Sequence, residues 1–67
     1  MTPGQKAVAL SMAAEIREQA EREYELTAQN FALNPTRPVA DHLIGRIDAL
    51  VAARETQRAV AEWGVQE

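Results

Sequence analysis

The chain has no cysteine, a single histidine, and only one residue each of tryptophan, tyrosine and phenylalanine among its 67 positions. Without cysteine it cannot form a disulfide, a thiolate metal site or a thiol nucleophile. One imidazole, that of His42, excludes a zinc or haem site that needs several histidines. A chain this short buries only about 60% of its unfolded surface when it folds alone. We therefore expect further stabilisation from association with another chain.

Basic residues are also scarce, since seven Lys and Arg stand against ten Asp and Glu, for a net charge of −3. A nucleic-acid-binding domain usually shows a basic patch or stripe, and neither half of this sequence has one. Direct binding of nucleic acid is therefore disfavoured. Long apolar runs are missing as well, so we expect no membrane span and no secretory signal. The predicted location is therefore cytoplasmic. The many alanines and the excess of arginine over lysine suggest a bacterium or an infected bacterial host.

Proline marks one clear break in the sequence. Pro35 and Pro38 cannot both lie inside a helix. The stretches on either side are rich in Ala, Glu, Gln, Arg and Leu, which favour helices, and β-branched residues never alternate as they would in a strand. The sequence therefore predicts an all-α single domain over residues 1–67. It consists of a helix over about 3–33, a turn at 34–37 and a helix over about 38–63.

Several residues fit the ends of these helices. Thr2 and Gln5 have the spacing of a capping box around Pro3. Thr36, or the residue after it, is expected to cap the second helix, with Asp41 in its first turn. Gly64 is expected to terminate that helix.

The second helix carries an apolar seam whose members follow one another by four and three residues. They are Leu43, Ile47, Leu50, Arg54, Gln57 and Ala61, widened by Val39, Ala40, Ile44 and Val51. A charge in such a seam is costly unless it is paired. We therefore expect that Arg54 meets a glutamate of another helix, with Glu18 opposite it and Glu15 a turn away, or that this end of the seam is hydrated. An acidic stripe, expected to be solvated, repeats every seven residues at Asp41, Asp48, Glu55 and Glu62.

The first helix has a thinner apolar face, half of it alanine or threonine. This face comprises Ala9, Met12, Ala13, Ile16, Ala20, Tyr24, Thr27 and Phe31. Small residues allow close approach, so an antiparallel hairpin is expected, with the pairs Thr27–Gly45, Ala20–Ala52 and Ala13–Ala59. Gly45 is unfavourable inside a helix, and the close crossing would explain it. Glu23, at the edge of this face, is expected to pair with an arginine.

Each helix has more apolar surface than a hairpin can cover. Val8, Leu26 and Leu33 flank the face of the first helix. Gly45, Ala49, Ala52 and Ala59 lie on the back of the second. Two antiparallel helices bury one stripe each, so we expect two hairpins to dimerise into a four-helix bundle.

The residue types that carry catalysis are not brought together. Ser11 and His42 lie near the starts of different helices, and an antiparallel hairpin separates them by most of its length. A dimetal bundle needs a Glu-x-x-His pair, but Val39 occupies the position three before His42. We predict no catalytic residue, no metal, no cofactor and no enzymatic activity.

The leading hypothesis is a non-enzymatic protein–protein interaction module: a small adaptor, an assembly subunit or an inhibitor. Its partner would be a second copy of the chain, another protein, or both. The predicted interface residues are Val39, Leu43, Ile44, Ile47, Leu50, Val51, Arg54 and Trp63.

Two alternatives remain open. One is a phage-type inhibitor of a host nucleoprotein complex, which would present an acidic helix face to a basic groove. That face would consist of Glu15, Glu18, Glu21 and Glu25. The other is a small DNA-binding regulator, which the net charge disfavours.

Overall fold

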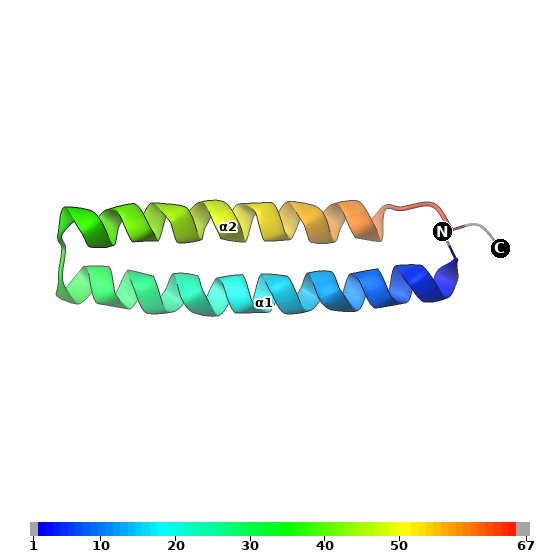
Figure 1. Ribbon diagram of the computed structural model, residues 1–67, viewed down its shortest axis with the longest axis horizontal. Coiled ribbons are helices and arrows are strands. Elements are labelled where there is room, and N and C mark those ends of the chain that lie inside the picture. The colour runs from blue at the N-terminus through cyan, green and yellow to red at the C-terminus, as the bar shows by residue number, and fades with distance from the viewer. Residues whose placement is uncertain (1, 66–67) are drawn as a thin grey trace.

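The computed structural model describes residues 2–65, which form an antiparallel hairpin of two long helices (Figure 1). Helix α1 spans Pro3–Leu33 and helix α2 spans Arg37–Ala61, with residues 34–36 as the turn. The molecule is a rod 53 Å long, and the start of α1 lies beside the end of α2 at the end of the rod opposite the turn (Figure 1). The all-helical hairpin predicted from the sequence is confirmed.

The first helix begins with the predicted capping box. The Thr2 hydroxyl accepts a hydrogen bond from the Gln5 backbone N–H at 3.2 Å, and the Gln5 side-chain oxygen accepts from the Thr2 N–H at 3.0 Å. Pro3 follows in the first turn, where its missing N–H costs nothing. At the other end of α1, the Asn34 N–H donates to the Asn30 carbonyl at 2.8 Å.

The ends of α2 differ from the sequence prediction. Its N-cap is Thr36, but within the described residues the Thr36 side chain makes no capping hydrogen bond, and Asp41 lies beyond the first turn. The helix ends at Ala61, two residues earlier than expected. Among residues 2–65 no glycine adopts a positive φ, so Gly64 is not the predicted glycine stop. Instead, the Glu62 N–H bonds back to the carbonyls of Arg58 and Ala59.

The seam between the helices is formed by residues that recur by three and four positions and are buried or half-buried. In α1 they are Leu10, Ala13, Arg17, Ala20, Tyr24, Thr27 and Phe31. In α2 they are Val39, Leu43, Leu50, Ala53, Gln57 and Val60, with Arg46 at the edge. At the centre, Ala20, Leu50 and Ala53 pack together with Tyr24 against them.

The predicted seam was partly wrong. In α2 it correctly included Leu43, Leu50 and Gln57. It included Ile47, Arg54 and Ala61, which are exposed, where the structure has Arg46, Ala53 and Val60. Apolar residues surround most of this helix, so the pattern does not single out one direction. Long polar side chains also fit the seam, since their stems pack while their head groups reach water.

Residues of the first helix and of the predicted small-residue pairs also lie on other faces than expected. Met12 and Ile16 were expected in the hairpin core but are 58% and 55% exposed. Gly45, Ala52 and Ala59 are exposed as well, so the three predicted close-approach pairs do not form. Ala20 packs on Ala53, one residue from the expected Ala52. The relative height of the two helices along the rod is therefore close to the prediction. Compared with the prediction, α2 is rotated about its own axis by about one residue position.

Two broad faces flank the seam. In an antiparallel pair, the positions that follow seam residues in both helices lie on one side, and those that precede them lie on the other. We call the first the Ile47 face: Ser11, Ala14, Glu18, Glu21, Glu25, Ala28, Ala32, Ala40, Ile44, Ile47, Val51, Arg54, Arg58 and Ala61. We call the second the Met12 face: Ala9, Met12, Ile16, Gln19, Glu23, Leu26, Asn30, Leu33, His42, Gly45, Ala49, Ala52, Thr56 and Ala59.

Candidate interaction surfaces

Large apolar side chains remain exposed on both faces of the hairpin. The residues more than two-fifths exposed are Val8, Met12, Ile16, Leu26, Leu33, Ile44, Ile47, Val51, Trp63 and Val65. The buried hydrophobic residues among those described, in contrast, are Ala13, Ala20, Leu50, Ala53 and Val60. Burial of an alanine removes far less apolar area than burial of a leucine or isoleucine. The hairpin therefore has a thin core and leaves most of its large apolar side chains in contact with solvent.

The predicted interface residues separate into three groups. Leu50 is buried between the helices, and Val39 and Leu43 are half-buried further along the same seam, so these three serve the hairpin itself. Ile44, Ile47, Val51 and Arg54 are exposed on the Ile47 face. Trp63 follows the end of α2, and its carbonyl accepts a hydrogen bond from the Lys6 ammonium at 2.9 Å.

Charged groups divide the Ile47 face into two parts. Near the turn it is aliphatic, with Ile44 and Ile47 beside the alanines of α1. Further along, Arg54 lies 3.5 Å from Glu21 of α1. The predicted pairing of Arg54 with a glutamate of the other helix is confirmed, but the partner is Glu21 rather than Glu18.

Glu21 is the best-connected carboxylate in the described residues. It accepts a hydrogen bond from Arg17, one turn earlier on the same helix, at 2.9 Å. This hydrogen bond holds the pKa of the Glu21 carboxyl below its ordinary value, against a partial desolvation that acts in the opposite direction. The charge of Arg17 and the contact with Arg54 lower that pKa further.

The proposed acidic face of α1 is not a single surface. Glu18 and Glu25 are exposed on the Ile47 face, and Glu15 is exposed on the outer side of α1. Glu21 is only 34% exposed and is shared by two arginines, so it does not point freely outward as expected. The inhibitor hypothesis that rests on these four residues stays a prediction. The acidic stripe of α2 is exposed throughout, as expected.

The Met12 face is the less charged of the two. Its one charged member, Glu23, accepts a hydrogen bond from Arg46 of α2 at 3.2 Å, which confirms the predicted arginine partner. Otherwise this face joins large side chains on α1 to small residues on α2. Met12, Ile16, Leu26 and Leu33 are all exposed, as are Gly45, Ala49, Ala52 and Ala59.

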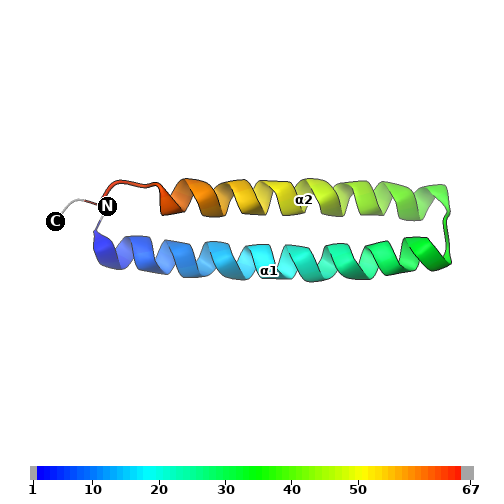
Figure 2. The same cartoon turned by 180° about the vertical axis from the view of Figure 1, so that it is seen from behind.

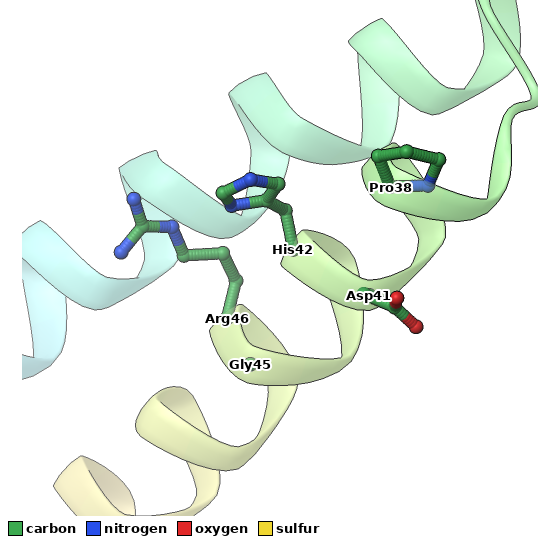
Figure 3. Close-up of a pocket in the computed structure, with 5 residues that line it drawn as sticks. All are labelled: Pro38, Asp41, His42, Gly45 and Arg46. Carbon is green, nitrogen blue, oxygen red and sulfur yellow. The ribbon is translucent and has the colours of Figure 1, made fainter.

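An open hollow of about 550 Å³ lies on this face near the turn, lined by Pro38, Asp41, His42, Gly45 and Arg46. Figure 3 shows His42 and Arg46 extending to the same side of α2, whereas Asp41 points away from them. Gly45 forms the floor between these side chains. Among the described residues, nothing lies within 4 Å of the position that a Cβ of Gly45 would occupy. The close helix crossing expected at this glycine is therefore not made within the chain.

The side chains that could perform chemistry stay apart. Ser11 lies in the first third of α1 and His42 near the start of α2. Figure 2 shows that the starts of the two helices lie at opposite ends of the rod. Within residues 2–65, no three His, Asp or Glu side chains gather in a way that could hold a metal ion. Neither helix, over the same range, has an apolar stretch long enough to cross a bilayer.

Sequence reasoning identified both sets of residues on the Met12 face but did not bring them together. It placed Leu26 and Leu33 on a flank and the small residues on the back of α2. It assigned Met12 and Ile16 to the hairpin core. Gly45 was the sequence signal that could have pointed to a contact on this face, since a glycine in a helix interior is unfavourable unless something approaches it closely.

Comparisons with protein-family models, curated proteins and solved structures gave no match for this chain.

Proposed function

We propose that this protein is a non-enzymatic protein–protein interaction module that acts through the apolar faces of its helices. The observation that carries the proposal is the exposure of large aliphatic side chains on both broad faces of a thin hairpin. A concentration of large exposed apolar side chains is typical of protein-binding sites. The module would serve as an adaptor, an assembly subunit or an inhibitor.

The total surface area supports self-association. A compact monomer of 7.4 kDa is expected to expose about 4,200 Å², whereas the hairpin exposes 5019 Å². The excess, about 800 Å², is close to what each partner contributes to a stable dimer interface. We propose a homodimer with two-fold symmetry that forms a four-helix bundle. Such a dimer covers one face of each hairpin and leaves the other for a different protein.

Solution mass tests the self-association. Light scattering over a dilution series should give about twice 7.4 kDa at high concentration and shift toward the monomer on dilution. A helical monomer at every concentration would rule out the homodimer.

A capture experiment tests the binding of another protein. We expect the tagged chain to retain a specific protein from a lysate of the cells that make it, and the Ile47→Glu variant to lose it. Asp48→Lys, on the exposed acidic stripe, is the control for a changed charge on the same helix. Equal capture by Ile47→Glu and the unmodified chain would argue against the Ile47 face.

A further inference from the structure

We infer that the Met12 face binds a second copy of this chain, with both turns at the same end of the dimer and Leu26 of each copy seated in the hollow beside Gly45 of the other. This inference rests on the proposed function, because it requires the apolar faces to be contact surfaces. It goes further by choosing the face, the occupant and the orientation.

The register of the hairpin determines which residues of α1 and α2 lie at the same height along the rod. The contacts Glu23–Arg46, Glu21–Arg54 and Lys6–Trp63 fix how the two helices lie alongside each other. With an equal rise per residue in both helices, Leu26 is level with Gly45. Met12 is likewise level with Ala59. On this face, Leu26 and Met12 of α1 therefore each have a small residue of α2 at the same height along the rod.

In a dimer whose two-fold axis runs parallel to the rod, residues that lie side by side within one hairpin face each other across the two copies. This axis keeps every residue at its height and places α1 of one copy over α2 of the other. Leu26, which is 66% exposed, then lies over the hollow at Gly45. Met12 lies over Ala59 in the same way. A large side chain inserted among small ones is how adjacent helices interlock in bundles.

The hollow beside Gly45 also provides space for the side chain of Leu26 from the second copy. Gly45 costs helix stability, and among the described residues no part of the chain approaches the space it leaves. A leucine from another molecule would fill that space. A perpendicular two-fold axis would instead place α1 against α1, where large residues meet large ones, and would leave the hollow facing the small residues of the other α2.

Charge also favours this face over the other. The charge of Glu23 is already paired with Arg46, so two Met12 faces meet without an unpaired ion between them. The Ile47 face carries three glutamates and two arginines by comparison. Three members of the acidic stripe of α2, Asp48, Glu55 and Glu62, lie away from the seam and from the hollow. Asp41 lines the hollow, but its carboxylate points away from His42 and Arg46 (Figure 3). Covering the Met12 face therefore removes apolar surface from water and desolvates one ion pair, Glu23–Arg46, whereas covering the Ile47 face would desolvate five charged side chains.

A substitution and its reversal test the contact directly. Gly45→Leu should fill the hollow and weaken the dimer by about tenfold or more in its dissociation constant, measured by analytical ultracentrifugation. The double variant Leu26→Ala/Gly45→Leu restores the combined volume and should recover most of the affinity. Asp48→Leu adds the same side chain on the exposed acidic stripe and should leave the dimer unchanged. An undiminished dimer in Gly45→Leu would overturn the inference.

A matched pair of variants tests the choice of face. Ile16→Glu alters the Met12 face and Ile47→Glu alters the Ile47 face, with the same chemical change. We expect only Ile16→Glu to give a monomer. If Ile47→Glu alone abolishes the dimer, the Met12 face is not the dimer interface, yet the self-association in the proposed function is retained. If the unmodified chain is a monomer throughout, both the inference and the homodimer fail, and only the capture experiment can support the module.

Labels on the otherwise unaltered chain test the orientation and remain informative if a variant fails to fold. The absence of cysteine allows single pyrene labels through Asn34→Cys, in the turn, and Ala7→Cys, near the other end. We expect excimer emission from the Asn34→Cys dimer without mixing the two labelled chains. Excimer emission only after mixing Asn34→Cys and Ala7→Cys chains would show opposed turns and overturn the inference.

Discussion

Arg54 of α2 lies 3.5 Å from Glu21 of α1, which also accepts a hydrogen bond from Arg17. One carboxylate thus joins two arginines from different helices. The contact lies at the edge of the Ile47 face, where it fixes the level of α2 against α1. Because Glu21 is partly exposed and close to water, its contribution depends on pH and salt.

The pH dependence of stability is expected to change in Glu21→Gln. Folding lowers the pKa of Glu21 below its ordinary value near 4.5. The stabilisation is therefore fully present above that value and is lost as the pH falls through the lower pKa of the folded state. Thermal melting should show Glu21→Gln slightly below the unmodified chain at neutral pH and equal to it in acid. Glu55→Gln, on the acidic stripe, is the control. A constant difference at every pH would contradict this prediction.

Leu50→Asp is expected to unfold the hairpin. Leu50 is 9% exposed and packs with Ala20 and Ala53, so an aspartate there loses apolar burial and places a carboxylate in the core. We expect a loss of about 3 kcal/mol or more, measured by chemical denaturation followed by circular dichroism. The neighbouring Val51→Asp, on an exposed side chain, should cost less than about 1 kcal/mol. Similar losses in both variants would mean that Leu50 is not in the seam.

Gly45→Ala is expected to stabilise the isolated hairpin. Among residues 2–65 nothing lies within 4 Å of the added Cβ, and alanine is favoured over glycine inside a helix by about 1 kcal/mol. Denaturant unfolding at a concentration where the chain is monomeric should show this gain. Ala52→Gly, at another exposed position of α2, should show a loss of similar size. A destabilised Gly45→Ala monomer would show that the hollow is needed within one chain.

Thr2→Ala is expected to loosen the start of α1. The substitution removes the hydroxyl that accepts the Gln5 N–H, and the loss of such a cap costs about 1 kcal/mol. Hydrogen exchange should speed up at the first amides of α1 and stay unchanged at its centre. Thr56→Ala, on an exposed position inside α2, tests the same change away from a cap. Unaltered exchange at the first amides would show that the capping box contributes nothing.

The sequence by itself determined the two helices, their capping box and their antiparallel pairing. These are local or nearly local properties: Pro35 and Pro38 interrupt any helix, and Thr2 with Gln5 satisfies free N–H groups only three residues apart. The short turn leaves α2 no direction except back along α1. The excess of apolar surface could also be predicted from the sequence, since two helices can bury only one stripe each.

The tertiary structure alone decided which stripe is buried. Apolar residues cover most of α2, so several rotations of the helix bury similar areas, and sequence spacing cannot choose among them. The choice was made by contacts between the helices: Ala53 fits against Ala20, and Arg46 and Arg54 reach Glu23 and Glu21. These contacts leave Met12 and Ile16 of α1 and Gly45 of α2 at the surface, on the face where we place a second copy.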